Sequence, residues 1–239
     1  MHSAATGAGD IPEAAAYAHV AARRPLYESA KRVIDVAFSL AVIVLLAPLW
    51  VFIALLVKLT SPGPILFRAD AVGLGGRPYA CLKFRTMRVD EEDAHHREWI
   101  AKYVQANQPY TVVTDKDGNE RQVFKVINDA RVTSIGRFLR KSGLDEVPQF
   151  VNVLRGDMSV VGPRPPRTFE YAHYNAYQRQ RLGVLPGITG LYQVTARSTA
   201  SFDEVMALDL RYIATRSIAL DLAIMARTIP VLVFGRGGF

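Results

Sequence analysis

The sequence predicts an α+β fold, mostly helical with a small β-sheet, that is anchored to a membrane by an amino-terminal re-entrant helix-break-helix. Three observations predict it. A strongly apolar run covers 33–57 and is interrupted by Pro48. Two short β-prone stretches separated by glycines follow this run. From residue 134 onward, apolar residues recur mainly at helical spacing.

The apolar run has 25 residues and one charge, Asp35. At ~1.5 Å per residue, a straight helix of this length would cross a hydrocarbon core of ~30 Å. Proline inside a helix removes a backbone donor and clashes with the preceding turn, at a cost of ~3 kcal/mol or more. A kink at Pro48 would therefore turn the chain back, so that both ends leave on one face.

Charges around the run favour this interpretation. Cationic flanks prefer the cytoplasmic side of a membrane, and a simple spanning helix would place one basic cluster on the wrong side. An ordinary spanning helix and a buried core helix remain the alternatives. The basic residues before and after the run are Arg23, Arg24, Lys31, Arg32, Lys58, Arg68 and Arg77.

The remaining elements are predicted from local patterns. Residues 1–29 are expected to be a mobile tail because they carry almost no periodic pattern. The other expectations are hairpins at 64–88 and 111–127, a charged helix at 89–105, helices at 134–139 and 145–154, a rigid loop at 163–166, a helical stretch at 168–182, a turn at Pro186-Gly187, and one or two amphipathic helices at 202–234.

Composition limits the partners. The net charge of +7 favours an anionic partner: nucleic acid, anionic lipid or a phosphorylated substrate. Cys81 is the only cysteine, so no intrachain disulfide can form, and a packing role is expected for it. His95 and His96 are adjacent and lack ligand spacing, which indicates a solvated helix face rather than a metal site.

Two segments concentrate positive charge. Residues 58–88 contain six basic residues and one acid, and residues 131–181 contain nine basic residues and four acids. Guanidinium groups bind phosphate oxygens in a bidentate fork, so the two segments could converge on a diphosphate. A solvated basic surface that faces anionic lipid explains the charge equally well.

Asp145 and Glu146 are neighbouring carboxylates at a predicted helix start. Free amides and the helix dipole stabilise negative charge there, so the position favours the ionised form that a nucleophile or a magnesium ligand requires. A carboxylate can attack phosphorus and divide one displacement into two. On spacing alone, however, Asp145 could simply cap the helix.

The stretch GLDEVPQFVNVLRGDMSVVGPRP (143–165) resembles the signature of the bacterial sugar transferase family, the small monotopic polyprenyl-phosphate phosphoglycosyl transferases. The resemblance extends over roughly residues 30–239. Further blocks match in order: the 31–58 anchor with its proline, TSPGP (60–64), KFRTM (83–87), PGITG (186–190) and the carboxyl-terminal stretch through LDL (220–222).

The resemblance implies a re-entrant anchor at 30–59 and a catalytic domain with interfacial helices at 60–239, on the cytoplasmic face of the bacterial inner membrane. It also implies a two-step transfer of a sugar phosphate from a UDP-sugar to polyprenyl (undecaprenyl) phosphate, with UMP released and Mg²⁺ as cofactor. The length of the 90–127 segment is similar to that of hexose-1-phosphate transferases of exopolysaccharide and O-antigen synthesis, which favours glucose or galactose.

The family's roles carry over to matching positions. Asp145 would be the nucleophile and Glu146 a Mg²⁺ ligand. Arg140 matches an arginine near the phosphates, and the nucleotide would contact the block Pro163, Arg164 and Pro165. Lys83 and Arg85 match basic residues of the active-site rim.

The sequence departs from the family pattern at three places. Ala47 replaces a serine before Pro48, so the break depends on the proline alone. Gly143 replaces a serine, which leaves the helix cap to Ser142 or to Asp145 itself. Ala69, Asp70 and Ala71 replace polar residues, with no evident consequence.

Two other functions compete with the enzyme. A non-catalytic membrane module could use the basic face to hold anionic lipid or a partner in a polysaccharide assembly complex, and it would not need Asp145 or Glu146. A nucleic-acid binder is disfavoured by the hydrophobic anchor and by the lack of a recognised nucleic-acid motif. The sequence leaves a homodimer open.

Overall fold

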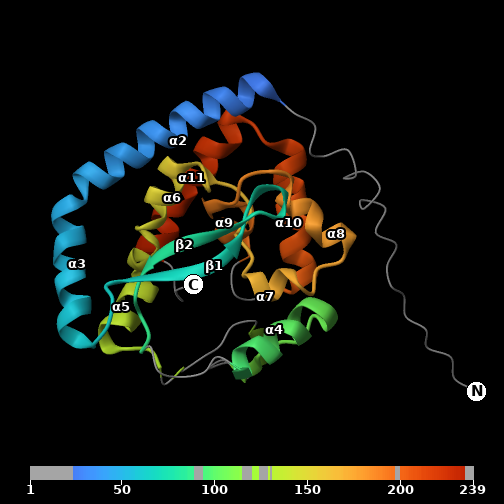
Figure 1. Ribbon diagram of the computed structural model, residues 1–239. Helices are drawn as coiled ribbons and strands as arrows, with labels where there is room; N and C mark the ends of the chain where they lie inside the picture. Colours follow the sequence, from blue (N-terminus) through green and yellow to red (C-terminus); the bar gives the residue numbers. More distant parts are fainter. Residues whose placement is uncertain are drawn as a thin grey trace, which may run out of the picture.

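The computed structural model describes residues 24–88, 94–114, 120–123, 129, 131–196 and 200–234. Most of the predicted tail therefore lies outside the described residues, as do the tip of the predicted 111–127 hairpin and the side chains of His95 and His96. The described part is mostly helical with small two-stranded sheets, which confirms the predicted mixture of helices and a minor β component (Figure 1).

The longer helices are α2 (Pro25–Leu45), α3 (Ala47–Thr60), α4 (Ala94–Ala106), α5 (Ser134–Ser142), α6 (Gln149–Arg155), α10 (Phe202–Thr215) and α11 (Ile218–Phe234). Shorter helical segments are η1 (Leu74–Gly76), η2 (Leu144–Glu146), α7 (Thr168–Tyr171), α8 (Ala176–Arg179), η3 (Gln180–Gly183) and α9 (Leu191–Thr195). The strands are β1 (Leu66–Val72), β2 (Pro78–Phe84), β3 (Thr111–Thr114), β4 (Glu120–Val123), β5 (Ser159–Val161) and β6 (Gly187–Thr189).

Helices α2 and α3 wrap around the outside of the molecule (Figure 1) and are bent by 64° at a break around Leu46. Pro48 lies in the first turn of α3, where a missing N–H leaves no helix bond unmade and the fixed φ suits a helix start. No single helix in the described residues has the length and apolar content to cross a membrane, whereas this bent pair meets that test when taken together. Because α2 begins at Pro25, residues 25–29 of the expected tail are helical.

The outer face of this pair is apolar. On the inner face, Asp35, Ser39, Ile53 and Val57 are buried against the rest of the protein. Such a continuous exposed apolar face is unsuited to a buried core helix and suits contact with lipid. Large exposed side chains on the two helices are Leu26, Val33, Phe38, Leu40, Val44, Leu45, Val51, Phe52, Leu55 and Leu59.

Strands β1 and β2 form the predicted antiparallel hairpin, in a register that pairs Leu66 with Phe84 and Val72 with Pro78. Its buried face packs on the main core cluster, which also contains Val153, Met158, Leu210 and Ile224. Cys81 is part of this face and is 2% exposed. Its predicted packing role is therefore confirmed.

Strands β5 and β6 form a parallel pair that the sequence did not reveal, and the predicted turn at Pro186-Gly187 is wrong because Gly187 begins β6. The two backbones approach too closely for side chains. A Cβ on Gly187 would lie 2.1 Å from the nitrogen of Gly162, and one on Gly162 would lie 2.5 Å from the carbonyl oxygen of Leu185. This contact fixes the start of the loop that contains Arg164.

Two predicted helix boundaries are also corrected. Helix α5 extends to Ser142 and ends at Gly143, whose φ of 71° is the left-handed conformation typical of a helix end. The helix predicted from Asp145 instead begins at Gln149, with Pro148 as its N-cap. The 168–182 stretch is divided into α7, α8 and η3, because Asn175 forms a capping box with Gln178 that starts a new helix.

Candidate active site

Asp145 and Glu146, the carboxylate pair, lie in the single 3-10 turn η2 between α5 and α6. Thr133 starts α5 by accepting a hydrogen bond from the Gly136 amide, and Gly143 ends it. No side chain caps η2 or α6. The expected capping role of Ser142 or Asp145 is therefore wrong: Ser142 donates to the Phe138 carbonyl at 2.9 Å instead.

Glu146 forms an ion pair with Lys83 of β2, whose ammonium nitrogen lies 2.5 Å from Oε1. Burial acts to raise the pKa of Glu146, but the Lys83 and Arg164 charges and hydrogen bonds from Lys83 and Gln149 outweigh it, so the pKa is lowered. Glu146 is consequently ionised at neutral pH. The hairpin therefore brings Lys83 to the carboxylate pair.

Asp145 is buried, with 8% of its surface exposed. Burial is the largest cause that raises its pKa, and the Glu146 charge adds to it; against the opposing charges of Lys83 and Arg140 the pKa is raised to about 6. The expectation that a helix start would favour ionisation is corrected here, because loss of hydration outweighs the local backbone. Above pH 7 the group is still mostly ionised. A carboxylate that its surroundings stabilise only weakly is a better nucleophile than one held by several donors.

The block Pro163, Arg164 and Pro165 forms the predicted rigid loop after β5, and the Arg164 side chain is exposed. Its charge lowers the pKa of Glu146, which places it on the same side of the domain as the carboxylate pair. The loop is stabilised by Arg181, which is 2% exposed. The Arg181 guanidinium donates a hydrogen bond to the Arg164 carbonyl at 2.9 Å. Arg181 is itself paired with buried Asp209 and hydrogen-bonded to the Tyr174 hydroxyl.

Arg85 is the predicted site residue that the structure does not bring to the carboxylate pair. It is 4% exposed. Its guanidinium donates to the Pro62 carbonyl at 2.7 Å and to the carbonyl and hydroxyl oxygens of Ser61 at 2.6 and 2.8 Å. These bonds tie the end of β2 to the chain just after α3. Pro48 lies at the opposite end of α3 and acts on the anchor alone.

Three residues near the site were missed by the sequence-based reasoning. Gln149 hydrogen-bonds Glu146, Arg181 supports the Arg164 loop, and Tyr192 of α9 is close enough to Arg164 for that charge to lower its pKa against a larger rise from burial. Gln149 is three residues from Glu146 and could have been suspected from helical spacing. Nothing in the sequence distinguishes Arg181 from the other arginines or Tyr192 from the other tyrosines.

The donor atoms at this site suit a hard cation. Glu146 and Asp145 offer carboxylate oxygens, the ligands that Mg²⁺ prefers. Within the described ranges no group of three or more His, Cys, Asp or Glu side chains could hold a metal. Mg²⁺ is usually bound through one or two carboxylates, with water and substrate phosphates as its remaining ligands, so the chemistry of these two carboxylates is compatible with this ion.

Known proteins and a family model match most of this chain. A family model described as bacterial sugar transferase matches residues 26–235. Galactosyl transferase CpsE of Streptococcus agalactiae is 38% identical over 209 residues, which are 87% of this chain and 43% of CpsE. Exopolysaccharide production protein ExoY of Rhizobium meliloti is 36% identical over 216 residues, 90% of this chain and 91% of ExoY.

A third relative is UDP-glucose:undecaprenyl-phosphate glucose-1-phosphate transferase of Caulobacter vibrioides, 41% identical over 211 residues, which are 85% of this chain and 69% of that protein. The chain thus spans less than half of CpsE but almost the whole of ExoY. The matched region includes the bent helix pair, the hairpin, the carboxylate pair and the Arg164 loop.

Proposed function

We propose that this chain, which belongs to the bacterial sugar transferase family, moves a hexose 1-phosphate from a UDP-sugar to polyprenyl phosphate and releases UMP. The observation that carries the proposal is the carboxylate pair: Asp145 with a pKa of about 6, next to Glu146 held by Lys83. A relative's name specifies UDP-glucose and undecaprenyl phosphate as its substrates. The same two substrate classes, a UDP-sugar and a polyprenyl phosphate, are proposed here.

In the first step, a carboxylate oxygen of Asp145 attacks the phosphorus that carries the sugar. The bond from this phosphorus to the UMP oxygen breaks, and a phosphosugar remains on Asp145. The charges of Lys83, Arg140 and Arg164 already act on the carboxylate pair. They would offset the negative charge that develops on the phosphate oxygens.

In the second step, a phosphate oxygen of the polyprenyl phosphate attacks the same phosphorus. The Asp145 carboxylate leaves, and the product is a polyprenyl diphosphate sugar. Two displacements at one phosphorus, with Asp145 first as nucleophile and then as leaving group, replace one direct transfer between a soluble donor and a lipid. The enzyme therefore needs Asp145 both accessible to the donor and held near the lipid surface.

Glu146 would hold Mg²⁺ together with the donor diphosphate. When bound, Mg²⁺ supplies Lewis-acid neutralisation of the diphosphate charge. Lys83 forms an ion pair with Glu146. It would share this carboxylate with a bound Mg²⁺.

The membrane location is part of the proposal. The exposed apolar faces of α2 and α3 would enter one leaflet, and the 64° bend supports a re-entrant anchor. The catalytic domain would lie on the cytoplasmic face of the bacterial inner membrane, where UDP-sugars are available. Membrane lipids are thus expected partners, and glucose or galactose is the favoured sugar.

The decisive test uses the purified full-length protein with polyprenyl phosphate, Mg²⁺ and a panel of UDP-sugars, with UMP as the readout. Incubation with a donor labelled in the sugar, without acceptor, should leave label on Asp145, located by peptide mass spectrometry. Product formation without any adduct at Asp145 would refute the covalent route. Binding of anionic vesicles without UMP release from any donor would favour the non-catalytic module instead.

A further inference from the structure

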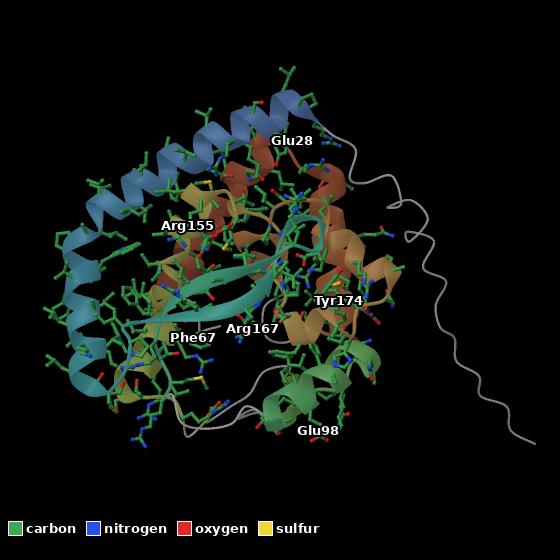
Figure 2. The ribbon with its side chains drawn as sticks, in the orientation of Figure 1. Glu28, Phe67, Glu98, Arg155, Arg167 and Tyr174 are labelled. Carbon is green, nitrogen blue, oxygen red and sulfur yellow. The ribbon has the colours of Figure 1, made fainter. Side chains whose placement is uncertain are left out.

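The helix α2 makes polar contacts with the catalytic domain as well as presenting an apolar outer face. Arg32 donates two hydrogen bonds to the end of α6, to the Val153 carbonyl at 2.6 Å and to the Leu154 carbonyl at 3.0 Å. Carbonyls at a helix end carry partial negative charge, so an arginine fork suits them. Figure 2 shows Arg155, the last residue of α6, beneath α2.

Asp35, one turn further along the same helix, makes the second contact. It is 3% exposed, and its Oδ1 accepts a hydrogen bond from the Val160 amide of β5 at 3.1 Å. A charged acceptor paired with a backbone amide away from water forms a strong hydrogen bond. Asp35, the one charge within the apolar run, therefore joins α2 to β5.

These two contacts join α2 to the two parts of the proposed active site, the carboxylate pair and the Arg164 loop, through neighbouring elements. Helix α6, which Arg32 binds, begins three residues after Glu146. Strand β5, which Asp35 binds, ends three residues before Arg164. One turn of the membrane helix is thus hydrogen-bonded to the element after the carboxylate pair and to the element before the arginine loop.

The active site does not need α2 to hold its own parts together. Asn152 of α6 binds β2 through the Leu82 amide at 2.9 Å and the Ala80 carbonyl at 2.8 Å, and so places Lys83 beside the carboxylate pair. The close contact of β5 with β6 and the Arg181 bond fix the Arg164 loop. The hydrogen bonds from Arg32 and Asp35 of α2 therefore determine where the assembled site lies relative to the apolar face of the anchor.

We propose that Arg32 and Asp35 are positioning residues that hold the carboxylate pair at the depth of the acceptor phosphate in the bilayer. The inference rests on the proposed function, in which a soluble donor reacts first and a membrane-embedded acceptor second. The first step needs only the intact site. The second step also needs Asp145 and the lipid phosphate at one height, because displacement of the reacting atoms by ~1 Å is enough to slow a reaction by ~100-fold.

The test compares the two steps in full-length protein reconstituted in nanodiscs. Exchange of labelled UMP into the UDP-sugar that the wild-type protein uses reports the first step. Transfer to long-chain polyprenyl phosphate in the nanodisc reports the second, and transfer to water-soluble geranyl phosphate in detergent reports the second step without a fixed depth. The variants are Arg32→Ala, Asp35→Ala and the conservative Asp35→Asn, which keeps an acceptor for the Val160 amide.

For Arg32→Ala and Asp35→Ala, transfer to the bilayer-embedded acceptor should fall by roughly tenfold, the effect of losing a charged hydrogen bond. UMP exchange and transfer to geranyl phosphate should change by less than about threefold, a factor smaller than that loss. Asp35→Asn should recover most of the bilayer activity. Arg24→Ala is the matched control, because Arg24 binds the carbonyls of Ala214 and Arg216 at the end of α10 rather than the elements of the site.

Equal losses in all three assays would overturn the proposal and assign Arg32 and Asp35 a purely structural role, as would unchanged transfer in the nanodisc. Thermal unfolding of each variant separates a folding defect from a positional one. Absence of UMP exchange in the wild-type protein would refute the proposed function, and this inference with it. Normal wild-type exchange with no selective loss in the variants would refute the positioning role alone.

Discussion

The ammonium nitrogen of Lys83 lies 2.5 Å from Oε1 of Glu146, although the two residues are 63 positions apart in the chain. The ion pair joins the β1–β2 hairpin to the turn between α5 and α6. It places a cation beside two carboxylates, one of which has its pKa lowered and the other raised. Divergent pKa values in neighbouring carboxylates are typical of groups with separate chemical roles.

Replacing the proposed nucleophile should abolish the first step. Asp145→Asn keeps the shape of the side chain but removes the attacking oxygen's charge, so UMP release from a UDP-sugar should fall by roughly 1000-fold or more. Asp70→Asn, an exposed carboxylate on β1, is the control and should retain full turnover. Unchanged UMP release in Asp145→Asn would eliminate this residue as the nucleophile.

The pKa of Asp145 predicts a pH dependence. Because that pKa is raised to about 6, the reactive carboxylate gains population as the pH rises through 6 and loses it as the pH falls. The single-turnover rate of UMP release should therefore drop about tenfold per unit well below pH 6 and level off above pH 7. Lys83→Met removes a charge that lowers this pKa. In this variant the fall in the rate of UMP release at acidic pH should therefore begin at a higher pH. An acidic limb near pH 4 in the wild type would contradict the assignment.

The Lys83–Glu146 pair predicts how the metal binds. In the free protein Lys83 already neutralises Glu146, so Mn²⁺, used as a spectroscopic substitute for Mg²⁺, should bind weakly alone and much more tightly with UDP. Lys83→Met should strengthen binding of Mn²⁺ alone, by several-fold in a paramagnetic resonance titration, because Glu146 loses its competing cation.

Lys102→Met serves as the control for this titration, since it breaks the exposed Lys102–Glu98 pair and leaves Glu146 untouched. Tight Mn²⁺ binding by the wild-type protein without UDP, unaffected by Lys83→Met, would show that Lys83 does not compete with the metal.

The bend between α2 and α3 predicts the topology of the anchor. Pro48→Leu should favour a straight spanning helix and move the amino-terminal tail to the other side of the membrane. A cysteine introduced as Ser3→Cys can be labelled with a membrane-impermeant maleimide in intact cells and in inverted vesicles, and Cys81 should stay unlabelled because it is buried. Ala47→Leu is the control that retains the proline. A tail on the same side in both variants would mean that Pro48 does not determine the turn.

Because the Arg164 side chain is exposed near the carboxylate pair, we expect its loss to impair use of the UDP-sugar but not binding to membranes. Arg164→Ala should reduce kcat/KM for the UDP-sugar by roughly 10- to 100-fold, the effect of losing a charged hydrogen bond to phosphate. Association with anionic vesicles should remain close to that of the wild type. Arg155→Ala, an exposed arginine at the end of α6, is the matched control. Equal losses of donor use and vesicle binding would favour a lipid-binding basic patch.

Features set by local chemistry were predictable from the sequence. Pro48 in an apolar run determines a helix break because proline lacks the N–H that a continuous helix needs. The glycines between two β-prone runs determine the hairpin of β1 and β2. The carboxylate pair, Arg140 and the Arg164 loop were found through an ordered set of motifs, and the predicted residues lie around one site, with Arg85 as the exception.

Other features depend on distant segments that meet only in the folded chain. The close contact of Gly162 with Gly187 creates a parallel strand pair from two stretches that look like a loop and a turn. The buried position of Arg85 follows from the place where α3 ends, and the role of Arg181 follows from a loop 17 residues away. Local residue patterns contain no signal for such contacts.

The sequence by itself determined which residues are candidates for the chemistry, through an ordered set of motifs, and where the anchor breaks, through a proline in an apolar run. Only the tertiary structure decided the protonation behaviour of Asp145, the pairing of Lys83 with Glu146 and the bonds from Arg32 and Asp35 to the two halves of the site. The physical reason is that burial and charge act through space, and their strength depends on which segments exclude water from one another.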